Sequence, residues 1–251
     1  LADRGEFGFE HFRRFERAQG RRTVLIDADL TSPFRLRAAG SMDQGTIADV
    51  FAGRRTIHEV LQRTACGVQY VPGVQDADRP FQPSPEDCGR MCSAELPALE
   101  RYADAVVVLL DGTESHWNSA LWRVACGILV VATESPASRV AAYTLIKQQA
   151  AQPWRGNVYA LVNRASSPAA ADEALARLAD ACQRFLERQI SAVGGIAADD
   201  ALEHPDPLER PLIVHSPRCE AARALECLAE LLWRDLSTGR ARTASAGPHA
   251  A

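Results

Sequence analysis

The sequence predicts an α/β fold with a mostly parallel sheet that carries helices on both faces. Two observations predict it. Short apolar runs alternate along the chain with segments of helical spacing. Most of these runs are continuously apolar, which is typical of parallel strands buried on both faces by helices.

The expected strands are short, apolar and often β-branched, and three of them are followed at once by an acidic residue or Pro. In chain order they cover residues 22–26, 68–71, 105–110, 127–132, 157–162, 192–196 and 212–214. Helical spacing of apolar residues predicts the elements between them. These helices cover residues 46–52, 57–62, 94–102, 140–149, 170–189 and 220–236, after a short amphipathic helix that ends at Gly20.

The elements predict one α/β domain over residues 1–236. The Pro-rich stretch 72–85 is expected to be a loop. Residues 237–251 are small, polar and interrupted by Gly and Pro, which predicts a disordered tail.

Composition excludes several classes of protein. With 47% hydrophobic and 24% charged residues, the chain resembles neither a disordered nor a fibrous protein. The longest apolar runs fall far short of the roughly 20 residues that cross a bilayer, and no signal segment opens the chain. A net charge of −4 offers no global field for nucleic acid, and seven irregularly spaced Cys do not form a disulfide framework. We therefore expect a cytoplasmic protein.

Acidic residues follow two of the predicted strands. The run TVLIDADL delivers Asp27 and Asp29 at the carboxyl end of a strand, where α/β sheets bind ligands. The run VVVLLDG does the same for Asp111. Carboxylates at such an edge suit Mg²⁺ coordination or the orientation of a water molecule, and Asp111 is the type of residue that holds a metal through water in nucleoside triphosphatases. The alternative is a pair of strand-end turns with solvated acids.

Six segments of the sequence form a recognisable series: IDADL, GTIADVFAGRRTIHEVL, VQYVPG, VVATESPASRVAAYTLIK, ALVNRASS and GGIAADDALEHPDPLERPLIVHSPRCEAARAL. This series resembles the MinD/ParA superfamily of deviant Walker ATPases, nearest to its FlhG and MinD branch. Together the segments span about residues 21–236.

The resemblance implies a P-loop NTPase-like fold that binds ATP and Mg²⁺. It implies catalytic roles for Asp27, Asp29 and Asp111, with Asp29 and Asp111 at the metal. It places Asn163 and Arg164 beside the adenine, with Asp199 in the segment that closes the base pocket. It further implies a homodimer with a protein partner of unknown identity, acting in the placement of flagella, division sites or partition machinery.

In this family a first strand and a Gly-rich P-loop, whose backbone N–H groups and Lys hold the phosphates, precede the IDADL strand by about one helix. Here the P-loop Lys and Thr would fall near Gly5 and Glu6, and no such motif is present. We therefore expect either that an upstream strand and P-loop belong to the full-length protein, or that the flanking strands pair directly with each other. The protein is expected to be an ATP hydrolase if a P-loop lies upstream of residue 1, and this chain alone is expected to be inactive.

Two alternatives stay open. One is a degenerate pseudo-ATPase that keeps the fold as an interaction scaffold and binds no nucleotide. The other is an exopolysaccharide-type tyrosine-kinase domain, which is disfavoured because such domains carry a C-terminal Tyr cluster and the last Tyr here is Tyr159.

Overall fold

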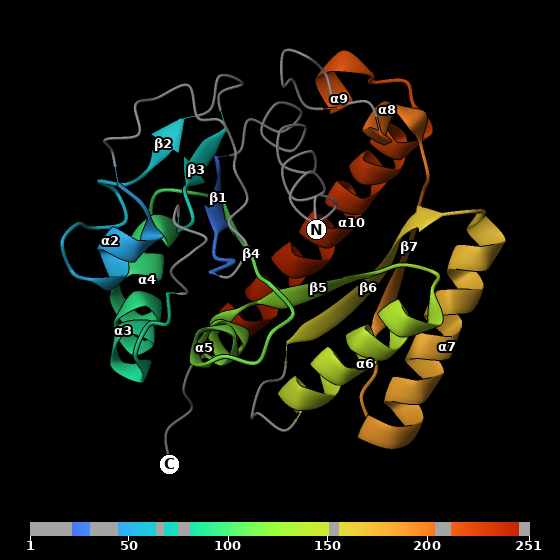
Figure 1. Cartoon of the computed structure of the whole chain (residues 1–251), viewed down its shortest axis with the longest axis horizontal. Helices are drawn as coiled ribbons and strands as arrows, with labels where there is room; N and C mark the ends of the chain where they lie inside the picture. The colour runs from blue at the N-terminus through green and yellow to red at the C-terminus, as the bar shows by residue number, and fades with distance from the viewer. Residues whose placement is uncertain are drawn as a thin grey trace. The chain divides into compact units, whose positions relative to one another are not determined.

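The computed structural model describes residues 22–30, 45–63, 68–74, 81–150, 156–203 and 212–245. The predicted helix before Gly20 and the expected P-loop position lie outside these ranges. The chain divides into two compact units, one of residues 1–121 and 206–215 and the other of residues 122–205 and 216–251 (Figure 1). A single domain over residues 1–236 stays a prediction.

The first unit contains a four-stranded sheet in the order β2-β3-β1-β4. Its strands are β1 (Thr23–Asp27), β2 (Gln62–Arg63), β3 (Gln69–Val71) and β4 (Ala105–Leu109). Strand β1 pairs in parallel with β3 and β4, whereas the short edge strand β2 pairs antiparallel with β3. The strands β1, β3 and β4 therefore end at the same edge of the sheet.

Helices of the first unit pack on one face of this sheet. They are α2 (Ile47–Phe51), α3 (Pro85–Arg90), the π-helical turn η2 (Met91–Glu95), α4 (Leu96–Glu100) and the start of α5 (His116–Val124). The short helix α9 (Leu212–His215) is also assigned to the first unit. Side chains from α2, α3, η2, α4 and α5 share a buried core with the even-numbered positions of β1. Capping boxes formed by Thr46 with Asp49 and by Ser84 with Asp87 begin α2 and α3.

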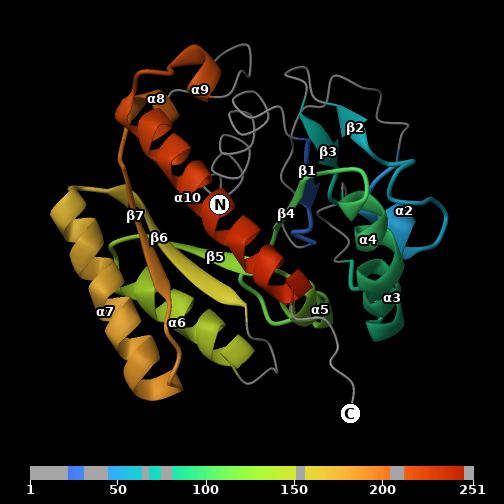
Figure 2. The same ribbon diagram turned by 180° about the vertical axis from the view of Figure 1, so that it is seen from behind.

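The second unit contains a parallel sheet in the order β5-β6-β7. Its elements are β5 (Gly127–Ala132), α6 (Pro136–Ala150), β6 (Asn157–Ala165), α7 (Pro168–Leu186), β7 (Ser191–Ala197), α8 (Asp200–Glu203) and α10 (Glu220–Ser245). Within this unit α6 and α7 cover one face of the sheet and α10 the other, as Figures 1 and 2 show from opposite sides. Gly127 permits the approach of α10, because a Cβ atom there would meet Leu236 at 2.7 Å.

The predicted fold class is confirmed, since both units contain parallel strands that alternate along the chain with helices. Within the described residues, no helix is long and apolar enough to cross a membrane.

Four predicted elements need correction, and one helix was not predicted. Residues 57–60 form turns with i→i+3 bonds, not a helix, and residues 212–215 are helical although their apolar run resembles a strand. Runs this short do not distinguish the two periods. Helix α3 begins already at Pro85, behind a Ser cap, and α5 was not predicted. Helix α10 continues to Ser245, so a disordered tail from residue 237 is wrong at least for 237–245, where Ser, Thr and a single Gly do not stop a helix.

Candidate functional site

The carboxyl edge of the first sheet gathers the three predicted acidic residues. Asp27 is the last residue of β1, and Asp29 lies two residues beyond it. Asp111 lies two residues beyond the end of β4. Asp27 is opposite Leu109 in the parallel ladder, and the Ala28 N–H donates to the Leu109 carbonyl at 3.0 Å. The structure therefore places all three residues at one edge, as the strand directions predict.

Asp27 is buried completely, at 0% exposure. Its Oδ1 accepts a hydrogen bond from the backbone N–H of Asp29 at 3.3 Å. The backbone of Gly73, which follows β3, lies against the same carboxylate, because a Cβ at this position would meet Asp27 Oδ2 at 2.5 Å. Burial, and then the negative charge of Asp27, raise the pKa of Tyr70 on β3. Asp27 is thus enclosed by β3 and the loop after it.

Asp111 is held by its own loop. Its Oδ1 accepts from the Thr113 N–H at 3.2 Å and from Asn118 Nδ2 at 2.7 Å, and its Oδ2 accepts from the Thr113 hydroxyl at 2.7 Å. The sequence analysis missed Thr113 and Asn118. Two features of the sequence could have indicated them. Asp-Gly-Thr is typical of a turn, and Ser115 is a residue type that caps helices, which predicts a helix whose first turn contains Asn118.

The donor set of this edge fits Mg²⁺ in chemistry, because hard cations prefer carboxylate oxygens. Among the residues that the structure describes, however, no three or more His, Cys, Asp or Glu side chains are grouped to hold a metal by themselves. Mg²⁺ in phosphate-transfer sites is commonly held by one or two carboxylates, with phosphate oxygens and waters completing the shell. Asp29 and Asp111 would supply carboxylates of that kind.

A second set of predicted residues lies at the carboxyl edge of the sheet in the second unit. Asn163 is buried and Arg164 is exposed, both near the end of β6. The Ala198 N–H donates to the Ala165 carbonyl at 3.0 Å, so the chain just before Asp199 is paired with the end of β6. Asn163, Arg164 and Asp199 therefore share one sheet edge.

The Asn163 side chain also forms a hydrogen bond with the backbone of the next residue. Its Oδ1 accepts the N–H of Arg164 at 3.0 Å. Arg164 has a φ of 55°, in the left-handed region that residues with a Cβ seldom adopt. A strained backbone at the end of a strand is a common feature of binding sites, and here it turns the chain directly after the buried Asn163.

Asp199 connects β7 with two helices. Its carboxylate accepts from the N–H of Ala201 at 3.0 Å, in α8, and from the N–H of Ala221 at 3.2 Å, in α10. Burial opposes ionisation, but these backbone N–H groups, helped by the Cys219 side chain, lower the pKa of Asp199. This carboxylate therefore has a capping role that the sequence analysis did not foresee.

Glu134, after β5, is a further residue that the sequence analysis missed. Its Oε1 accepts the Ser166 N–H at 2.6 Å, and both carboxylate oxygens lie within 3.0 Å of the Ser166 hydroxyl. This pair joins the loops that follow β5 and β6 at the same sheet edge.

The chain is similar in sequence or fold to several known proteins. The antiactivator FleN of Pseudomonas aeruginosa is 28% identical over 214 residues, which cover 84% of this chain and 75% of FleN. No family model matches the sequence. Among solved structures, the cell division ATPase MinD of Pyrococcus furiosus has a TM-score of 0.72 at 16% identity over 93% of this chain and 94% of that one. A ParA family ATPase of Chlorobium tepidum has a TM-score of 0.68 at 16% identity over 92% of each chain.

The chain therefore has the P-loop NTPase-like α/β fold of these ATPases. The sequence similarity to FleN and this fold support the resemblance to the MinD/ParA superfamily that the sequence motifs predict.

Proposed function

We propose that this protein is a cytoplasmic, nucleotide-dependent switch ATPase that regulates or positions cell-surface machinery, such as flagella or the division or partition apparatus. The observation that carries the proposal is the convergence of Asp27, Asp29 and Asp111 on one sheet edge, with the Gly73 backbone against the innermost carboxylate. The sequence similarity to FleN, which is an antiactivator, favours a regulatory role for this protein.

ATP and Mg²⁺ are the proposed ligands. A MinD of Pyrococcus horikoshii with the same fold has been solved with Mg-ADP, at a TM-score of 0.72. In such a site the metal neutralises phosphate charge. In this chain Asp29 and Asp111 would orient metal-bound water, Asp27 would hold the N–H of Asp29 in place, and Asn163, Arg164 and Asp199 would border the base. A homodimer and a protein partner are part of the same proposal.

Calorimetry with Mg-ATP tests this function on the protein expressed from its complete gene. We expect Asp111→Asn to weaken Mg-ATP binding by about tenfold or more, because a neutral amide attracts metal-bound water less than a carboxylate does. The matched control is Asp104→Asn, since Asp104 lies just before β4, at the opposite edge, where it accepts the Arg22 N–H at 2.7 Å. Asp104→Asn should bind like the unmodified protein.

Equal binding by Asp111→Asn and the unmodified protein would contradict the proposed site. Failure of the unmodified protein to bind Mg-ATP at all would instead favour the alternative, an interaction scaffold without nucleotide.

A further inference from the structure

The side chain of Asn118 lies in the first turn of α5, the helix that follows the Asp111 loop. It is buried, at 2% exposure, and its backbone N–H donates to Ser115 Oγ at 3.0 Å. Ser115 thus caps the helix and fixes the backbone from which the amide extends.

The amide of Asn118 closes the loop through two short hydrogen bonds. Nδ2 donates to Asp111 Oδ1 at 2.7 Å and to the Thr113 carbonyl at 2.7 Å, and lies 3.4 Å from the Asp111 carbonyl. A primary amide has two N–H groups, and both short contacts are to acceptors. A carboxylate at position 118 would have no donor for either of them.

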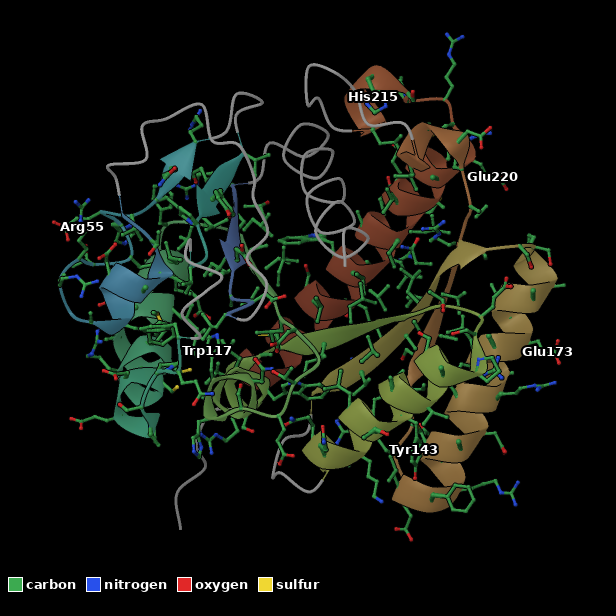
Figure 3. All side chains as sticks on the ribbon, in the orientation of Figure 1. Arg55, Trp117, Tyr143, Glu173, His215 and Glu220 are labelled. Atoms are coloured by element: carbon green, nitrogen blue, oxygen red, sulfur yellow. The ribbon has the colours of Figure 1, made fainter. Side chains whose placement is uncertain are left out.

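The first turn of α5 is itself anchored in the core of the first unit. Trp117, labelled in Figure 3, is 2% exposed and packs edge-to-face on Phe51 of α2 with a centroid distance of 4.9 Å. An edge-to-face pair of buried aromatic rings adds to the stability of the core around them. Packing of Trp117 in the core therefore determines where the backbone of Asn118 lies, and from there its amide contacts Asp111.

We propose that Asn118 is a positioning residue for Asp111, holding its carboxylate in the orientation that serves the metal; this inference rests on the proposed function. Asp111 Oδ1 accepts from both Asn118 and the Thr113 N–H. The carboxylate cannot rotate without breaking these bonds. Neighbours that fix the orientation of a metal-binding carboxylate typically change metal affinity by 10- to 100-fold when they are replaced.

The test uses Asn118→Asp, which keeps the shape but replaces the donor by a carboxylate facing Asp111. In the protein from its complete gene, we expect the Mg²⁺ concentration at half-maximal ATP hydrolysis to rise by about tenfold. Amide hydrogen exchange of residues 112–115 should accelerate by a similar factor as the loop opens. The control Ser119→Ala, one residue further along α5, should change neither quantity.

A double variant distinguishes the orientation of the Asp111 carboxylate from the stability of the loop formed by residues 112–115. Asp111→Asn combined with Asn118→Asp exchanges donor and acceptor at one of the two short contacts, so it should restore slow exchange of residues 112–115 in part; the Thr113 carbonyl still faces a carboxylate. It should not restore the Mg²⁺ response, because the carboxylate is then at position 118. Restoration of both would overturn the inference.

Two other outcomes are decisive. If Asn118→Asp lowers the melting temperature but leaves the Mg²⁺ dependence unchanged, the residue is merely structural. If the unmodified protein hydrolyses no ATP, the proposed function fails, and hydrogen exchange decides whether Asn118 closes the loop: unchanged exchange in Asn118→Asp would refute the inference by itself.

Discussion

Gly73 is the residue whose lack of a side chain most directly shapes the first sheet edge. The Asp27 carboxylate occupies the space where a Cβ would lie, with Oδ2 at 2.5 Å and Cγ at 2.7 Å from the ideal Cβ position. Because Asp27 is fully buried, its carboxylate has little room to retreat. The packing of Asp27 against position 73 therefore leaves no room for a side chain and favours glycine there.

We expect Gly73→Ala to lower the free energy of unfolding by about 1–3 kcal/mol, the usual cost of an overpacked site. Urea unfolding measures it. Gly89→Ala is the matched control, because a Cβ on Gly89 in α3 meets nothing within 4 Å, and Ala there should stabilise by roughly 0.5–1 kcal/mol. In an Asp27→Ala background the cost of Gly73→Ala should shrink. An equal cost in both backgrounds would show that Asp27 is not the obstacle.

Asp199 should contribute a pH-dependent part of the stability. Its pKa is lowered in the folded protein, where burial is outweighed by hydrogen bonds from the N–H groups of Ala201 and Ala221. On acidification the unfolded chain takes up this proton first, so the stabilisation is present above the usual aspartate pKa and is lost as pH falls through the lowered one. We expect Asp199→Asn to show a shallower loss of stability between about pH 5 and pH 2.

Chemical unfolding at several acidic pH values measures this slope. Asp172→Asn, on the exposed side of α7, serves as the comparison and should keep the slope of the unmodified protein. A slope in Asp199→Asn that matches the unmodified protein would refute the capping role.

At the scale of elements, polar contacts between β6 and α10 join the helix to the sheet of the second unit. The Tyr159 hydroxyl on β6 donates to Asp235 Oδ2 at 2.5 Å, and Asn157 Nδ2 lies 3.3 Å from the same hydroxyl. The close approach at Gly127 brings Leu236 to the same region of the sheet. The register of α10 on the sheet therefore depends on both contacts.

Burial, and then the hydrogen bond to Asp235, raise the pKa of Tyr159 to about 12 from 10.0. Between these values the unfolded chain releases the phenolic proton while the folded protein keeps it, so stability should fall as pH rises. Tyr159→Phe should lack this alkaline decrease and lose about 1 kcal/mol at neutral pH with the hydrogen bond. Unfolding by urea from pH 8 to pH 11.5 is the measurement. The same alkaline decrease in Tyr159→Phe would assign it to other groups.

At the scale of the whole molecule, most strands agree with the sequence, and the two segments assigned to the wrong type of element are both short. The β1, β4, β5 and β6 regions were recognised because strands buried on both faces must be continuously apolar. The segments 57–62 and 212–214 are too short for their periodicity to identify them. Helix α5 was overlooked although Trp117, Ala120, Leu121 and Val124 follow the helical spacing i, i+3, i+4 and i+7.

By itself the sequence determined the α/β class, the order of most elements and the common edge of Asp27, Asp29 and Asp111. Burial requires apolar strands, and parallel strands bring their carboxyl ends together. Only the tertiary structure decided that Gly73 packs on Asp27 and that Glu134 binds Ser166, 32 residues away. Such contacts arise when strand pairing aligns distant loops, and the distances between loops depend on the packed core. No local pattern of residues carries that information, because each loop satisfies its own turn rules whichever loop lies beside it.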